Sequence, residues 1–142
     1  MLRLAAFAVT SALAAAAAGP LPPLPPLGRL LATPDRLTID IANSGNPRVD
    51  GEYRLECRPV GGNHPEAEQA CARLEELADA GENPFAPTPR GQMCTFQHGG
   101  RATARVTGTW RGHKVNTTFQ REDGCGIARW KRLEPVLPGT GS

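Results

Sequence analysis

Cysteines are the residues of this 142-residue chain whose type and spacing most constrain its chemistry. There are four of them, Cys57, Cys71, Cys94 and Cys125. A zinc site would need closely spaced ligands such as a C-x-x-C pair, and no two of these cysteines are close in sequence. We therefore predict no metal site. An even number of cysteines in an exported chain instead predicts two disulfides.

Residues that could act as nucleophiles or bases are few, with three histidines and three serines in the whole chain. No G-x-S-x-G, phosphate-binding loop, dinucleotide-binding or H-E-x-x-H motif is present. The adjacent Glu75 and Glu76 point in different directions on a helix, which favours a solvated face over a glycosidase pair. We predict no catalytic residues and no cofactor, and a small secreted hydrolase is the least favoured of the functions considered.

Charge is nearly balanced, with 16 Lys and Arg against 14 Asp and Glu. The basic residues are scattered singly rather than gathered in a stripe, so we predict no nucleic-acid partner.

The N-terminus reads as an export signal. Arg3 precedes an uncharged apolar run over residues 4–18 that ends in three alanines, the pattern of a cleaved secretory peptide. The run is shorter than the roughly 20 residues of a membrane-spanning helix. We predict a signal peptide over 1–18, a proline-rich leader over 19–33 and one folded domain over 34–137. The mature protein should then be secreted into an oxidising, extracellular environment, with no membrane attachment.

The domain must be built from a few strands and one main helix. Alternating apolar and polar residues predict strands at 37–41 and 53–57 and a hairpin over 103–110 and 114–119. Apolar residues at three- and four-residue steps predict a helix from Glu66 that ends near Gly81, with His64 and Pro65 at its start. Residues 81–92 read as loop. The segment 127–133 fits a short helix or an edge strand, and the tail from Pro135 is expected to fray. Because strands and helices do not alternate, the predicted class is α+β with an antiparallel sheet.

Phe96 stands two residues after a half-cystine, between glycines on both sides. Most aromatic side chains are buried, so the residues by themselves favour a core position in a strand. The alternative is an exposed loop, tethered by a disulfide, that offers Phe96 to a pocket in another protein.

Several motifs together resemble the Streptomyces subtilisin inhibitor family. They are LECRP at 55–59, GNHP at 62–65, ACARL at 70–74, MCT at 93–95, WRGHKV at 110–115, and then Phe119 and Cys125. The order of the motifs and the cysteine spacing match over residues 37–125. The chain departs from the family after the reactive bond, where it has HGGR at 98–101 and one extra residue before Trp110.

The resemblance implies a secreted inhibitor of subtilisin- and chymotrypsin-like serine proteases. It implies a reactive bond between Phe96 and Gln97, with Met93, Cys94 and Thr95 lying extended along the protease and His98 on the leaving-group side. It also implies a homodimer packed through the sheet. The departure at 98–101 keeps open a non-inhibitory extracellular binding module on the same scaffold, since a fold alone does not determine a function.

Four cysteines allow three pairings. With the resemblance in view, we predict Cys57–Cys71 and Cys94–Cys125. The first bond would join a strand to the inward face of the helix, and the second would brace the base of the reactive loop.

Overall fold

A computed structural model of the chain describes residues 19–24 and 34–139. The chain divides into two compact units, of which the second, from Leu31 onward, holds all the helices and strands described here. The predicted signal peptide lies outside the described residues. Residues 19–24 of the predicted leader contain no helix or strand.

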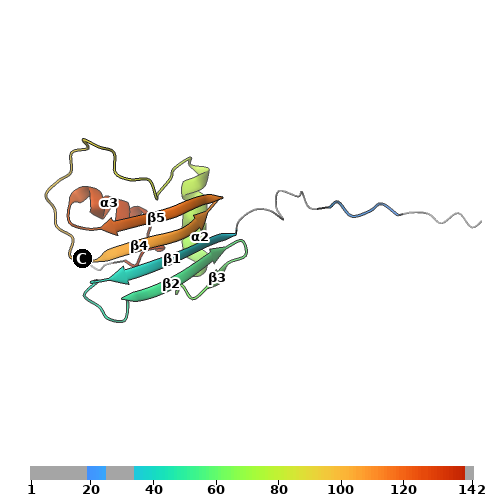
Figure 1. The fold of residues 1–142 in the computed structure, drawn as a ribbon, viewed down its shortest axis with the longest axis horizontal. Coiled ribbons are helices and arrows are strands. Elements are labelled where there is room, and N and C mark those ends of the chain that lie inside the picture. The colour runs from blue at the N-terminus through green and yellow to red at the C-terminus, as the bar shows by residue number, and fades with distance from the viewer. Residues whose placement is uncertain (1–18, 25–33, 140–142) are drawn as a thin grey trace, which may run out of the picture. The chain divides into compact units, whose positions relative to one another are not determined.

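The second unit is built on a five-stranded sheet in the order β3-β2-β1-β4-β5, with every neighbouring pair antiparallel (Figure 1). The strands are β1 (Asp35–Ala42), β2 (Gly51–Cys57), the two-residue β3 (Gly61–Gly62), β4 (Thr103–Trp110) and β5 (His113–Gln120). The predicted strands and hairpin are therefore confirmed, β4 with the predicted bounds and the others with slightly wider ones, while β3 was not predicted. Leu37, Ile39 and Ile41 of β1 are buried and the residues between them are not, which is the alternation of a sheet with one covered face.

Two helices cover that face, α2 (Ala67–Asp79) and α3 (Gly124–Arg132) (Figure 1). Helix α2 confirms the predicted helix, and its buried residues are Ala70, Cys71, Leu74 and Leu77. Helix α3 decides the alternative left open for the segment 127–133, which is helical and not an edge strand. It begins where the Asp123 carboxylate accepts a hydrogen bond from the Gly126 N–H at 2.7 Å, an ordinary N-cap. No helix among the described residues is long and apolar enough to span a membrane.

The expectation that the tail frays from Pro135 is wrong. Val136 and Leu137 are buried in the core, and the indole N–H of Trp130 donates to the Pro138 carbonyl at 2.8 Å. Apolar side chains that follow a helix within a few residues can fold back onto the same core, and burying each contributes about 1.5–3 kcal/mol.

His64 links the start of α2 to this C-terminal segment. Its Nδ1 accepts a hydrogen bond from the Glu66 N–H at 3.0 Å, and its Nε2 lies 2.9 Å from the Val136 carbonyl oxygen. One neutral tautomer, protonated at Nε2, satisfies both contacts. His64 therefore has a structural role at the helix start, as its position before Pro65 predicts.

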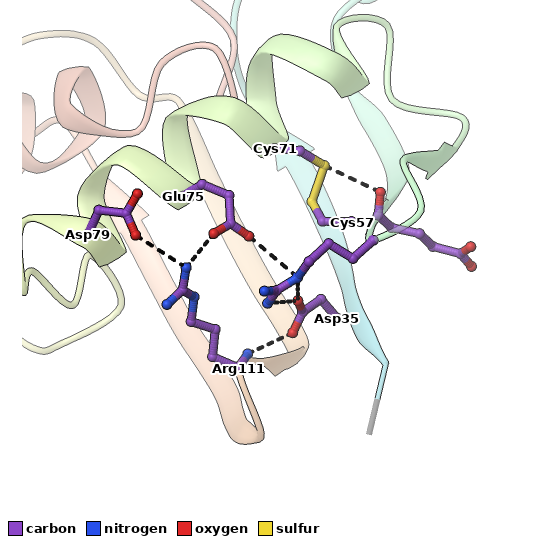
Figure 2. A network of polar contacts seen from close by, with 8 residues as sticks. Asp35, Cys57, Cys71, Glu75, Asp79 and Arg111 are labelled. Carbon is purple, nitrogen blue, oxygen red and sulfur yellow. Dashed lines mark hydrogen bonds and ion pairs between the residues drawn. A yellow bond between two sulfur atoms is a disulfide. The ribbon is translucent and has the colours of Figure 1, made fainter. Parts of the chain in front are cut away.

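An ionic network ties together the end of the sheet where β1 begins (Figure 2). The buried Asp35 carboxylate accepts hydrogen bonds from the Arg58 guanidinium at 2.6 and 3.1 Å and from the Arg111 backbone N–H at 2.7 Å. Hydrogen bonding to Asp35 raises the pKa of Arg58. Glu75 of α2 pairs with both arginines, so the expectation of a simply solvated face holds for the exposed Glu76 but is wrong for Glu75.

We expect Asp35→Asn to lower the free energy of unfolding by about 1–3 kcal/mol, because it removes the charge of a buried carboxylate that accepts three hydrogen bonds. Asp40→Asn is the matched control, since Asp40 lies on the same strand, is exposed and belongs to none of the ion pairs found among the described residues. Urea unfolding of both variants checks this. Equal midpoints for the two would show that the network adds nothing to stability.

Candidate functional site

A long segment without helix or strand connects α2 to β4, and its last part, residues 93–101, is the candidate site (yellow in Figure 1). Phe96 has a relative exposure of 102% and Met93 one of 94%. The interpretation of Phe96 as a core residue is therefore wrong, and the exposed-loop alternative describes the structure. An exposed phenylalanine forgoes about 1.5–3 kcal/mol of burial, so the loop around it must be held away from the core.

The loop is anchored just before Phe96 by a disulfide and a backbone contact. Cys94 is bonded to Cys125 of α3, with the two Cα atoms 5.3 Å apart. The Gly124 N–H donates to the Thr95 carbonyl at 3.0 Å. A Cβ on Gly124 would lie 1.9 Å from Thr95 Oγ1, so only glycine at this position lets Thr95 rest against the start of the helix.

A second anchor lies just after the predicted reactive bond. The Gly99 N–H donates to the Arg121 carbonyl at 2.7 Å, and the Arg121 Nε–H donates back to the Gly99 carbonyl at 3.1 Å. A Cβ on Gly99 would approach Ile127 Cγ1 to 2.8 Å. Glycine is required here too, because the loop backbone lies directly on the side chains of α3 and of the residues before it.

Arg121 is the least expected part of this arrangement, because arginine is normally exposed and this one is only 6% exposed. Its guanidinium carbon lies 5.7 Å from the centre of the buried Trp130 ring, within cation–π distance. Its Nη1 is buried and has no hydrogen-bond partner among the described residues. An unpaired buried donor costs about 1–3 kcal/mol.

Arg129 makes a comparable contact with the first part of the long segment that connects α2 to β4. Its guanidinium stacks 4.6 Å from the Phe119 ring and donates to the Ala86 carbonyl at 3.0 Å. Burial lowers the pKa of Arg129. Arg129 of α3 and Arg121 before it thus hold two parts of the segment between α2 and β4, one near residue 86 and one near residue 99.

The predicted site residues are brought together as one presented peptide segment. Thr95, Phe96, Gln97 and His98 are exposed, while Cys94 is half-buried under them. His98 Nδ1 accepts a hydrogen bond from the Gly100 N–H at 3.2 Å, within its own loop. The arrangement offers an accessible bond held at both sides and brings no nucleophile and base together, which suits recognition by another protein's active site better than catalysis.

The two disulfides have the pairing that was predicted with the resemblance in view. The one away from the loop joins Cys57 of β2 to Cys71 of α2, with the Cα atoms 5.7 Å apart. Asp123 lies close to Cys94 and Cys125. Their sulfurs are bonded to each other and the carboxylate caps α3, so this group does not offer a metal ion free ligands.

Sequence reasoning missed Arg121, Gly124 and Gly99 as the residues that seat the loop. Asp123 followed by glycine gave a usable signal, because aspartate commonly precedes the first turn of a helix. Arg121 gave none, since an isolated arginine in a sequence is normally taken as a surface charge.

The fold and the loop define a small α+β protein that exposes one peptide segment, anchored on each side, to a partner. Residues 34–122 match the family model described as subtilisin inhibitor-like. The chain belongs to that family. Its curated relatives include a protein named as a protease inhibitor from Streptomyces orinoci, 35% identical over 90 residues, which are 63% of this chain and 81% of the relative. Another is subtilisin inhibitor-like protein 1 of Streptomyces cacaoi, 36% identical over 80 residues, which are 53% and 68% of the two chains.

Among solved structures, Streptomyces caespitosus sermetstatin, in a crystal structure with Bacillus licheniformis subtilisin, is similar with a TM-score of 0.47 and 17% identity. The similarity covers 75% of this chain and 100% of that one. The family assignment itself rests on the sequence matches.

We expect Gly124→Ala to destabilise the protein by about 1–3 kcal/mol through overpacking against Thr95, although alanine is the better helix former. Adding Thr95→Ala removes the hydroxyl that the new methyl group would meet and should restore most of the loss. Thermal unfolding of the single and double variants measures this coupling. Independent, additive effects of the two changes would contradict the close contact.

Proposed function

We propose that this protein inhibits subtilisin- and chymotrypsin-like serine proteases by occupying the active site as a substrate does, with the bond between Phe96 and Gln97 as its reactive bond. The observation that carries the proposal is the full exposure of Phe96 between two anchors. The names of the curated relatives support the same function, since one is called a protease inhibitor and the other subtilisin inhibitor-like.

Each part of the loop has a physical role in this proposal. Met93, Cys94 and Thr95 pair with the protease as an added strand, through backbone hydrogen bonds. Phe96 fills an apolar specificity pocket, whereas a trypsin-type pocket holds an aspartate that requires a cation. Because the loop is ordered before binding, less conformational entropy is lost on association.

Slow turnover follows from the two anchors. The protease's serine oxygen attacks the Phe96 carbonyl carbon, the bond to Gln97 breaks, and the Gln97 nitrogen leaves as an amine after taking a proton. If the amine stays in place, it attacks the ester carbonyl again and the serine oxygen leaves with a proton. Resealing then competes with release, and the protease remains occupied.

Substitution of Phe96 tests the proposal most directly. We expect Phe96→Gly to weaken subtilisin inhibition at least about 30-fold, the effect of losing a central interface anchor worth about 2 kcal/mol. Phe96→Lys should instead gain inhibition of trypsin. Residual protease activity, titrated with each variant against subtilisin, chymotrypsin and trypsin, gives the inhibition constants.

Val60→Gly is the matched control, because Val60 is an exposed large apolar residue outside the loop, at 47%, and lies in the turn before β3. It should leave inhibition unchanged. A parent protein that binds no serine protease, or a Phe96→Gly variant as potent as the parent, would favour the non-inhibitory binding module.

We also propose that the protein is exported. The charged start and apolar run of residues 1–18 support this, as do the two disulfides, which persist in oxidising compartments.

A homodimer through the uncovered face of the sheet is part of the same proposal. The middle of that face is a cross-strand row of Thr38, Thr107 and Asn116, and charges of both signs, such as the Arg36–Glu56 pair, flank it. Small uncharged residues let two sheet faces approach. Attraction between the flanking charges of the two copies is screened as salt rises, which should weaken the dimer.

Protein purified from the culture medium tests export and pairing together. We expect N-terminal sequencing to find residues 1–18 removed, and light scattering to give a dimer at low salt that shifts toward monomer at high salt. Protein found only inside the cells would contradict export, retention of Arg3 would contradict removal of the signal peptide, and a monomer at every salt concentration would contradict the dimer.

A further inference from the structure

Arg121 combines three features that stability alone does not explain. It is buried, one of its buried donors has no partner among the residues the structure describes, and its remaining contacts reach the loop and the Trp130 ring. An apolar residue of similar size would fill the same space without an unpaired donor. The guanidinium therefore fits a role in holding Gly99, which lies on the leaving-group side of the proposed reactive bond.

The connections of the chain define what that role is. A break between Phe96 and Gln97 separates Cys94 from Cys125 in sequence, yet their disulfide keeps both pieces in one molecule. The new carboxyl end, at Phe96, then lies two residues after Cys94 and one after Thr95. The Thr95 carbonyl accepts a hydrogen bond from the Gly124 N–H. The new amino end has no disulfide near it. Its nearest attachment is the pair of hydrogen bonds between Gly99 and Arg121.

We propose that Arg121 is the positioning residue that keeps the new amino end of Gln97 within reach of the Phe96 carbonyl carbon, so that the broken bond is remade. With Gly99 held, only Gln97 and His98 are free, a reach of about 7 Å. Without that attachment the free end extends back to the buried Ala102, five residues with a reach of about 17 Å.

The lengths of the two free segments set the size of the effect. The effective concentration of a tethered end falls roughly as the −3/2 power of its tether length. Lengthening the free segment from two residues to five therefore predicts about a fourfold lower effective concentration of the amine, and the equilibrium ratio of nicked to intact protein should rise about fourfold.

This inference rests on the proposed function only for its choice of reactive bond, and the experiment separates the two. Intact protein and protein nicked after Phe96 are each incubated with a trace of subtilisin until their compositions converge. Mass spectrometry gives the ratio of the two forms, which differ by one water. That ratio is a property of the inhibitor alone and does not depend on how tightly it binds the protease.

We expect Arg121→Met to raise the nicked-to-intact ratio by up to about fourfold, because it removes the side-chain bond to the Gly99 carbonyl and leaves only the backbone bond from the Gly99 N–H. Arg129→Met should leave the ratio as in the parent. Arg129 is the matched control because it also stacks on a core aromatic ring and bonds a loop carbonyl, but near residue 86. Gly99→Ala is a second variant that keeps the buried arginine, and the Cβ contacts with Ile127 and Arg121 should displace the loop and raise the ratio in the same direction.

Equal ratios in the parent, Arg121→Met and Gly99→Ala would overturn the role of Arg121, whether or not the parent inhibits. An equal rise in Arg129→Met would also overturn it, because the effect would then follow general destabilisation. A parent that reseals the bond but fails to inhibit any serine protease would overturn the proposed function and leave the positioning role supported.

Discussion

An exposed phenylalanine in a protein with a small core is the constraint on which the rest of this structure depends. Burial of Phe96 would be favourable by about 1.5–3 kcal/mol, so a free loop would tend to collapse onto the apolar surface nearby. The disulfide from Cys94 to Cys125 and the paired hydrogen bonds of Gly99 with Arg121 prevent that collapse. The Arg121 anchor lies directly after β5, and the Cys125 anchor lies at the start of α3, so a stretch of five residues carries the loop.

The opposite end of the sheet supplies stability instead of recognition. There the Cys57–Cys71 disulfide and the contacts of Asp35 join β1, β2, α2 and the turn after β4. The two disulfides join cysteines that are 14 and 31 positions apart in the sequence. Each disulfide contributes roughly 3–4 kcal/mol to stability on a chain-entropy estimate. In a domain of this size that contribution is comparable with the whole net stability. The fold can therefore tolerate glycines and an unpaired buried donor beneath the loop.

Local periodicity was enough to predict the four longer strands and α2, because residues such as Leu37, Ile39 and Ile41 alternate with polar neighbours regardless of what covers them. The features that failed depend on long-range contacts. Val136 and Leu137, which stand between two prolines, are typical of a frayed tail, and only the structure shows that Trp130 and His64 bond to this segment. Phe96 could be read either way, since the sequence does not show that both sides of it are held. Arg121 can be recognised as a residue that holds the loop only from the structure, which places Gly99 beside it.

The same few residues serve both the core and the loop, which couples stability to recognition. Phe119 of β5 and Trp130 of α3 are buried in the core. Arg121, Gly124 and Cys125 lie between these two residues in the sequence and contact the loop. Because both anchors fall within residues 121–125, a displacement of this stretch would move them together and keep their spacing across Phe96 and Gln97. A loop held to two independent elements would instead be stretched by every relative motion of those elements. Attachment to a single rigid connection lets the loop keep one shape even where the rest of the domain fluctuates.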